Sequence, residues 1–176
     1  PLCLRCGYPE ARRRVREEAT AARGDGPPTR DDLSELEYTK RTYQEALRLY
    51  PPAWAVFRRV NGPVKLGGYT IEDGAAVIVP LWSIHRDARY FDEPDAFDPD
   101  RWARRDPNAV AAYRPFASGP HACIGRGLAL SGATLVLARL VRDFDVDVPD
   151  DALDDLRLTP TLRPAAGISA TIDPIG

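Results

Sequence analysis

One cysteine lies in a setting suited to chemistry: Cys123, within the stretch RPFASGPHACIGRG of residues 114–127. Gly119 turns the chain before it, and Gly125 lacks a side chain that would crowd a flat ligand near the backbone. The apolar segment that follows is typical of a helix, and free N–H groups at a helix N-terminus stabilise a thiolate. Position alone leaves two interpretations open: a ligating thiolate shielded by Phe116, or a buried, inert cysteine.

The other two cysteines, Cys3 and Cys6, form a C-x-x-C pair near the N-terminus. Such a pair can supply half of a zinc site, but a closed structural site needs four ligands and no second pair follows. We therefore interpret the pair as incidental. An odd, small number of cysteines fits a reducing compartment better than a disulfide scaffold, which predicts a cytoplasmic protein.

The composition predicts one ordinary globular domain. The 176 residues carry a formal net charge of −2, whereas binding of nucleic acid phosphates needs a basic surface. The charge therefore argues against nucleic acid as the main partner. No apolar run approaches the roughly 20 residues that span a bilayer, so no membrane segment is expected in this chain.

Three helices are expected around the cysteine stretch. Residues 9–23 combine helix formers with mixed charge and few large apolar side chains, which predicts a solvated surface helix. Residues 33–50 form a second helix that ends at Pro51. Residues 128–144 are strongly apolar and are the best candidate for a buried helix.

Short strands and a long loop connect these helices. Residues 63–71 predict two strands about Gly67-Gly68, and residues 75–81 predict a short buried strand. Residues 92–115 lack periodicity, but their aromatic side chains indicate an ordered loop. The tail after residue 144 is typical of short strands joined by turns.

Two charged motifs accompany the cysteine. Glu45 and Arg48 in EALR lie at i and i+3, on one face of the predicted second helix. Taken alone, they are compatible with an ordinary surface ion pair. Arg101, in FDPDRW, is a third charged residue, within the long loop.

The motifs, taken together in this order, resemble those of one known family. The spacing F-x-x-G-x-x-x-C-x-G, read at Phe116, Gly119, Cys123 and Gly125, resembles the haem-binding signature of the cytochrome P450 family. EALR resembles the family's E-x-x-R, and FDPDRW resembles its P-x-R-F/W segment. GGYTI and IHRD are similar to the strands and the turn that lie between these two motifs in the family. The resemblance extends roughly from Pro9 to the C-terminus.

The resemblance implies a fold that is mainly α with small β-sheets (α+β). It corresponds to the C-terminal part of the family fold, without the distal helix that delivers protons or the N-terminal half. The segments it implies are an atypical start at 1–8, two helices in 9–52, a β region at 53–82, a meander at 83–115, the cysteine loop and its helix at 116–142, and β hairpins at 143–176.

The resemblance also implies a set of site residues. Cys123 would be the axial thiolate ligand of the iron of haem b, with Phe116, Gly119, Ile124 and Gly125 around the cofactor. Arg58 and His121 would contact the haem propionates, although both residue types are also common on surfaces. Glu45, Arg48 and Arg101 would form a buried cluster that serves folding and haem retention.

The function implied is a haem-thiolate monooxygenase. Its partners would be O2, a small organic substrate and an electron-donor protein, namely a ferredoxin, a flavodoxin or a reductase, docking near Arg114 and Arg126. Two alternatives remain open: the same haem used for peroxygenase or isomerase chemistry, and a non-catalytic fragment or remnant that keeps part of the fold.

Overall fold

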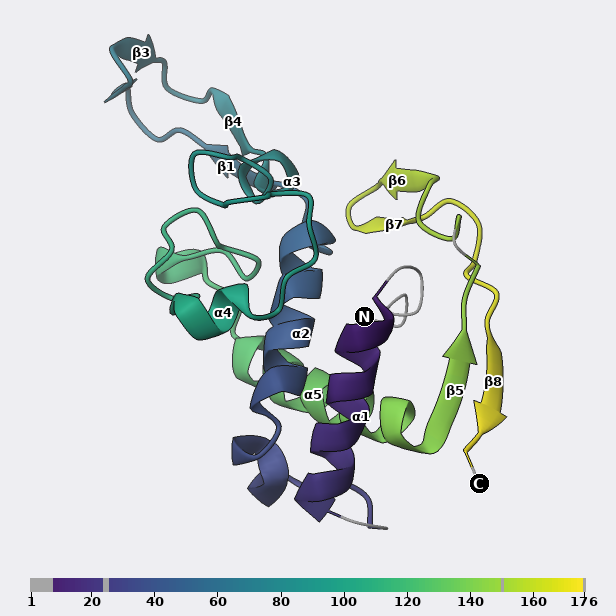
Figure 1. Ribbon diagram of the computed structural model, residues 1–176. Coiled ribbons are helices and arrows are strands. Elements are labelled where there is room, and N and C mark those ends of the chain that lie inside the picture. The colour runs from purple at the N-terminus through teal and green to yellow at the C-terminus, as the bar shows by residue number, and fades with distance from the viewer. Residues whose placement is uncertain (1–7, 24–25, 150, 176) are drawn as a thin grey trace.

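The structure is a computed structural model. Three helices form the centre of the molecule (Figure 1). The structure describes residues 8–23, 26–149 and 151–175. The Cys3–Cys6 pair lies outside these described residues. The central helices are α1 (Pro9–Arg23), α2 (Glu37–Leu49) and α5 (Arg126–Asp143). Helix α5 packs against both α1 and α2, so the segment after Cys123 anchors the whole helical body.

Helix α1 contributes to the core, which corrects the expectation of a solvated surface helix. Val15 is fully buried and packs with Tyr38 of α2 and Leu137 of α5. Ala19 is buried in a neighbouring cluster. These small side chains recur every four residues on one face, so a narrow stripe of α1 is buried while its charged face stays in solvent.

Helix α2 begins later than the sequence predicted. A separate 3-10 helix, Arg30–Ser34, precedes it and begins with a capping box between Thr29 and Asp32. The chain then turns at Leu36 before α2 starts at Glu37. Most of the second half of α2 is buried, including its two charged residues Glu45 and Arg48.

In the described part of the chain, the strands form four separate antiparallel pairs rather than one sheet (Figure 1). The pairs are β1 (Val56–Arg59) with β4 (Ala76–Val79), β2 (Val64–Leu66) with β3 (Tyr69–Ile71), β5 (Phe144–Asp147) with β8 (Thr171–Pro174), and β6 (Leu156–Leu158) with β7 (Leu162–Pro164). The predicted turn at Gly67-Gly68 has positive φ at both residues, which glycine adopts without strain.

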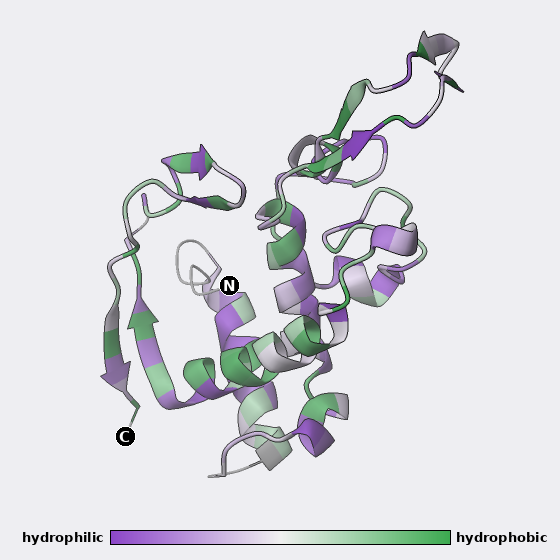
Figure 2. Cartoon of the chain, turned by 180° about the vertical axis from the view of Figure 1, so that it is seen from behind, coloured by the Kyte–Doolittle hydropathy of each residue, from purple (hydrophilic) through white to green (hydrophobic). Residues whose placement is uncertain are grey.

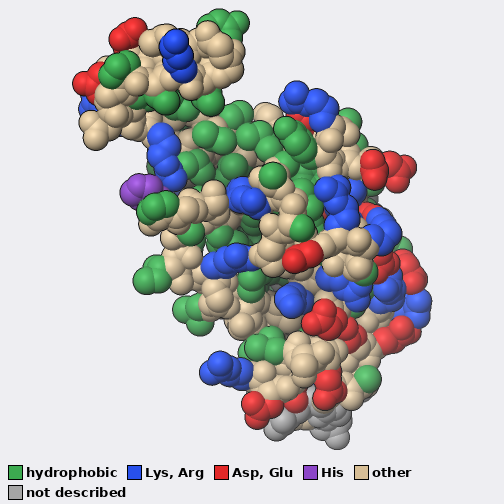
Figure 3. All heavy atoms as spheres, turned by 90° about the vertical axis from the view of Figure 1, so that its left-hand side faces the viewer, with side chains coloured by type: hydrophobic (Ala, Val, Ile, Leu, Met, Phe, Trp, Pro, Cys, Tyr) green, Lys and Arg blue, Asp and Glu red, His purple; other side chains and the backbone are tan. Residues whose placement is uncertain are grey.

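The strand predicted to be buried at 75–81 is instead half-exposed. Along β4 the side chains alternate between exposed and partly buried, and Ile78 is 55% exposed. An isolated two-stranded pair covers only one face of each strand, so period-two alternation replaces full burial. Figure 3 shows hydrophobic side chains gathered below this projecting β region.

The long loop is ordered, as its aromatic residues predicted. One short helix, α4 (Arg101–Arg104), lies within it, and another, α3 (Leu81–Ile84), precedes it. Five buried side chains form its core: Phe91, Trp102, Val110, Ala112 and Tyr113. The loop is therefore a rigid layer beside α2, and the cysteine stretch emerges from its end.

Helix α5 is less buried than its composition predicted. Figure 2 shows hydrophobic residues along it, and two of them are well exposed, Leu128 at 81% and Val136 at 58%. Among the described residues, no helix is long and apolar enough to cross a lipid bilayer. The observed fold is mainly helical with small antiparallel sheets, as predicted.

Candidate functional site

The cysteine stretch forms a closed loop in front of α5. The backbone N–H of Cys123 donates to the carbonyl of Phe116 at 2.9 Å, and the N–H of Ala122 donates to the carbonyl of Gly119 at 3.0 Å. Gly119 has φ +70°, a conformation that glycine adopts without strain. Ala117 takes a similar positive φ of 57° at the cost of a Cβ contact. The loop is thus shaped by its own backbone.

The thiol of Cys123 lies open at the surface of this loop. It is the free cysteine of the described part of the chain, and it is exposed. The interpretation as a buried, inert cysteine is therefore wrong for this structure, and Phe116, which is half-buried, leaves the sulfur accessible. A Cβ added to Gly125 would come within 3.8 Å of the sulfur, so this glycine keeps the space beside the thiol clear.

Exposed apolar side chains follow the thiol closely in the sequence. Ile124 is fully exposed, and Leu128 on the first turn of α5 is 81% exposed. Exposing large aliphatic side chains beside a thiol costs hydrophobic free energy unless something apolar covers them. The surface around Cys123 therefore has the character of a binding face rather than of ordinary solvent-exposed protein.

A pocket of about 340 Å³ is lined by the same loop, and Cys123 is not among its lining residues. It is lined by backbone and side chains of the loop together with Gln44 of α2 and Leu130 of α5. Two arginines, Arg114 and Arg126, also line it, and the exposed guanidinium of Arg126 contacts the side-chain oxygen of Asn108. The loop thus has an apolar face with the thiol and a second face with positive charge.

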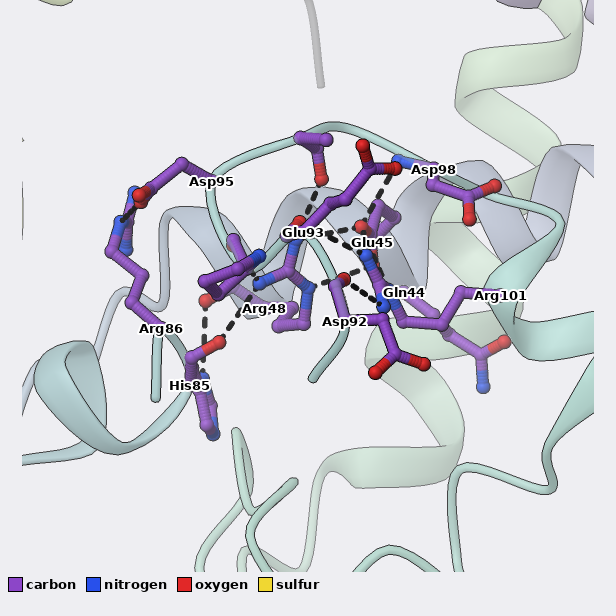
Figure 4. Close-up of polar contacts among 12 residues, drawn as sticks. Gln44, Glu45, Arg48, His85, Arg86, Asp92, Glu93, Asp95, Asp98 and Arg101 are labelled. Carbon is purple, nitrogen blue, oxygen red and sulfur yellow. Dashed lines mark hydrogen bonds and ion pairs between the residues drawn. The ribbon is translucent and has the colours of Figure 1, made fainter. Parts of the chain in front are cut away.

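The structure brings the three predicted charged residues together (Figure 4). Both oxygens of Glu45 accept from Arg48, at 3.0 Å and 2.8 Å, and Arg101 Nε lies 3.5 Å from Glu45 Oε1. Glu45 and Arg48 are fully buried, and Arg101 is 5% exposed. The alternative of a surface ion pair is therefore excluded, and the pair is a bidentate, desolvated one.

Backbone carbonyls of the long loop complete the cluster. Arg48 donates to the carbonyls of His85, Pro94 and Ala96, and Arg101 donates to those of Asp92 and Glu93. Glu45 in turn accepts the backbone N–H of Asp98 at 3.0 Å. The two guanidiniums therefore hold the loop onto α2, which is a structural task rather than a catalytic one.

Tyr113 and His85 extend this network to the cysteine loop. The hydroxyl of Tyr113 donates to the carbonyl of Gln44 at 2.9 Å, and burial raises the pKa of Tyr113 far above its usual range. The His85 ring lies 5.5 Å from the Tyr113 ring, centroid to centroid. Sequence analysis did not single out Tyr113, although its place directly before RPF was a usable signal.

Among the described residues, no hydrogen bond holds either predicted propionate contact, Arg58 or His121, beside Cys123. Arg58 donates to the carbonyl of the neighbouring Phe57, and His121 is exposed at the end of its 3-10 turn, Gly119–His121. Within the described residues, no hydrogen bond or ion pair joins Arg58 to His121. Arg58 does share a strand face with Val56, opposite that of Arg59, as period two predicts.

Comparison with known proteins identifies the class. The family model described as cytochrome P450 matches residues 3–170, so the chain belongs to the cytochrome P450 family. It is 37% identical to pentalenene oxygenase of Streptomyces avermitilis over 82% of this chain, and 34% identical to putative cytochrome P450 132 of Mycobacterium tuberculosis over 91%. A mouse relative, cytochrome P450 3A13, is 33% identical over 82%.

The chain spans about a third of the length of these relatives, 33%, 35% and 29% respectively. Its family implies a haem cofactor, and the residues present fit one. The exposed thiol supplies a soft ligand, Gly125 leaves room beside it, and Ile124 and Leu128 offer an apolar surface to a flat macrocycle. The set has the donor chemistry that a haem-thiolate site requires.

One residue that positions the site was missed by sequence analysis. Glu18 of α1 accepts the backbone N–H groups of Tyr38 and Thr39, both at 2.7 Å, at the start of α2. It also accepts the hydroxyl of Thr39 at 2.7 Å. The cap comes from 20 residues away, so no local pattern could have revealed it.

Proposed function

We propose that this chain holds haem b through the thiolate of Cys123, as the haem-binding part of a cytochrome P450 monooxygenase. The observation that supports this most is the open thiol on a pre-shaped loop, with Gly125 beside it and the exposed Ile124 and Leu128 following in the sequence. A thiolate-bound haem supplies reductive activation of O2 and insertion of oxygen into a small organic substrate.

The chain's own residues have supporting tasks in this proposal. The bond from Cys123 N–H to the Phe116 carbonyl fixes the backbone that carries the sulfur. Arg58 and His121 are proposed to donate to the propionates; both side chains are exposed, and Arg58 donates to the carbonyl of the neighbouring Phe57. Glu45, Arg48 and Arg101 retain the haem indirectly, by fixing the loop that leads to Cys123.

An electron-donor protein is proposed to dock on the pocket face of the loop. Arg114 and Arg126 line that pocket and would meet acidic groups of a ferredoxin, a flavodoxin or a reductase. The other face of the loop is the one proposed to carry the haem. Electrons would then enter from the side opposite to the substrate.

A carbon monoxide difference spectrum tests the proposal. The chain is mixed with haem, reduced and exposed to carbon monoxide, and a strongly red-shifted Soret band is the expected sign of thiolate ligation. Cys123→Ala should abolish that band, whereas the Cys3→Ala/Cys6→Ala double variant should retain it and so exclude ligation by the other thiols. Failure of the wild-type chain to take up haem, or persistence of the band in Cys123→Ala, would contradict the proposal.

A further inference from the structure

Both ring nitrogens of His85 are engaged by backbone groups, in a fully buried position. Nδ1 lies 3.1 Å from the carbonyl oxygen of Arg48, and Nε2 lies 3.1 Å from the backbone nitrogen of Arg114. A carbonyl can only accept and an N–H can only donate, so Nδ1 must carry the proton and Nε2 must be bare. The two partners therefore define one neutral tautomer.

The groups that face this ring do not favour a second proton. Arg48 approaches from α2, Arg86 is the next residue along the chain, and Arg114 belongs to the segment leading to Cys123. Glu45 accepts from Arg48, Arg101 and the backbone of Asp98, and the Tyr113 ring packs against the His85 ring. Burial is the main cause that lowers the pKa of His85 to about 4; the hydrogen bond to the Arg48 carbonyl opposes it, and the charges of Arg48 and Arg86 lower the pKa further.

The bond from Arg114 to His85 is the first of three that lead to the thiol. The N–H of Arg114 donates to His85 Nε2, and the carbonyl of Arg114 accepts from the N–H of Ala117 at 3.0 Å. The next residue back, Phe116, accepts from the N–H of Cys123 at 2.9 Å. The loop that carries Cys123 is thus fixed at its start, through His85, to the C-terminal end of α2.

We propose that His85 is a positioning residue that holds the Cys123 loop against α2, and that it does so only as the neutral Nδ1–H tautomer. A proton on Nε2 would set an N–H donor against the N–H of Arg114, so the bond would be lost and the loop released. The importance of this for haem rests on the proposed function, but the link itself does not.

Nitrogen-15 NMR of the two histidine rings tests the tautomer directly. The chain has only His85 and His121, so His121→Gln assigns both signals. The expected result at pH 7 is a neutral His85 ring protonated at Nδ1. A neutral ring protonated at Nε2, or a doubly protonated ring, would overturn the proposal without any further variant.

Amide hydrogen exchange tests the link to the loop, with no haem present. After correction for intrinsic exchange rates, the amides of Arg114, Ala117 and Cys123 should lose protection between pH 6 and 4, before the buried amides of α5. Equal pH dependence in the loop and in α5 would contradict the proposal.

Two substitutions separate the link from general packing. Glutamine at position 85 can present an uncharged acceptor near the place of Nε2, so His85→Gln should keep the loop protected and remove the acid step. Asparagine reaches only the place of Nδ1, so His85→Asn should raise loop exchange about tenfold at pH 7, the effect of one lost hydrogen bond. Glu17→Ala, at an exposed residue of α1 outside the loop and outside the proposed haem site, is the control and should change neither.

With haem added, lowering the pH should release less haem from His85→Gln than from the wild-type chain. Absence of haem uptake would defeat the proposed function and leave the exchange and NMR results to decide the role of His85. A Gln variant that keeps the same acid step as the wild-type chain, while remaining folded, would overturn the role itself.

Discussion

The buried carboxylate of Glu45 shows how a charge can lie inside this molecule. Its oxygens accept from Arg48, from Arg101 and from the backbone of Asp98, so every neighbour is a donor. Desolvating such a group is costly, and it is tolerated because the partners are complete. Removing one partner strands a buried charge.

Arg48→Ala should therefore lower the free energy of unfolding by about 3–5 kcal/mol. Arg48 is fully buried and donates to Glu45 and to three backbone carbonyls. Urea denaturation followed by circular dichroism measures the change. The control is Arg13→Ala, which removes only exposed partners on α1 and should leave the midpoint nearly unchanged. Equal midpoints for the two variants would contradict the assigned role of the cluster.

His85 should make the stability of the chain acid-sensitive. Its pKa in the folded chain, about 4, lies below the ordinary value of 6.5, so the unfolded state binds the proton first. Its contribution is fully present above pH 6.5 and is lost as the pH falls toward 4, by about 3 kcal/mol in total. Unfolding curves at pH 7, 5.5 and 4.5 measure this.

The comparison that isolates His85 is His85→Gln, which has no group that titrates in this range. Its unfolding free energy should fall less steeply than that of the wild-type chain between pH 6.5 and 4.5. Parallel curves would show that other groups, and not this ring, cause the acid sensitivity.

Among the elements, α2 depends on a neighbouring helix for its start. Its N-cap residue, Leu36, offers no side-chain acceptor, and Glu18 of α1 takes that place. A carboxylate at a helix N-terminus satisfies free N–H groups and complements the helix dipole. Helix α1 thus stabilises the helix that carries Glu45 and Arg48.

Glu18→Ala should lower the free energy of unfolding by about 1–2 kcal/mol, the usual cost of losing an N-cap. Glu17→Ala is the matched control, since Glu17 is an exposed residue of the same helix paired only with Arg13. Thermal unfolding followed by circular dichroism compares the midpoints of the two variants. Indistinguishable midpoints would contradict a capping role for Glu18.

Local pattern predicted the elements well and their environments less well. Helix α1 was predicted with its observed bounds, because its helix formers and the Pro9 start are local signals. Its burial was missed, because a stripe of small side chains, Ala11, Val15 and Ala19, carries little hydrophobic signal. The exposure of β4 was missed for the opposite reason: an apolar run indicates a buried strand only where a second layer covers it.

The site shows the same division. The spacing around Cys123 and the pairing of Glu45 with Arg48 could be predicted, since both lie within short windows of the sequence. The carbonyl partners of Arg48 and the cap from Glu18 could not, because they lie 20 to 48 residues away. Long-range polar contacts leave no periodic trace in a sequence.

At the scale of the whole molecule, haem should stabilise the chain by mass action. A ligand that binds only the folded state adds about 2.7 kcal/mol when its free concentration is 100 times its dissociation constant. The thermal midpoint should therefore rise with haem concentration in the wild-type chain. In Cys123→Ala the rise should be smaller, because the axial ligand is gone. A midpoint independent of haem in the wild-type chain would contradict binding to the folded state.

The buried cluster also has a consequence for the order of folding. The contacts of Glu45 with Arg48 lie within one helical turn, whereas those with Asp98 and Arg101 close 53 and 56 residues of chain. Long closures carry a larger entropic cost and are expected late in folding. Glu45 and Arg48 would then stay exposed to solvent until the loop packs onto α2. Removing Arg101 should therefore speed unfolding more than it slows refolding.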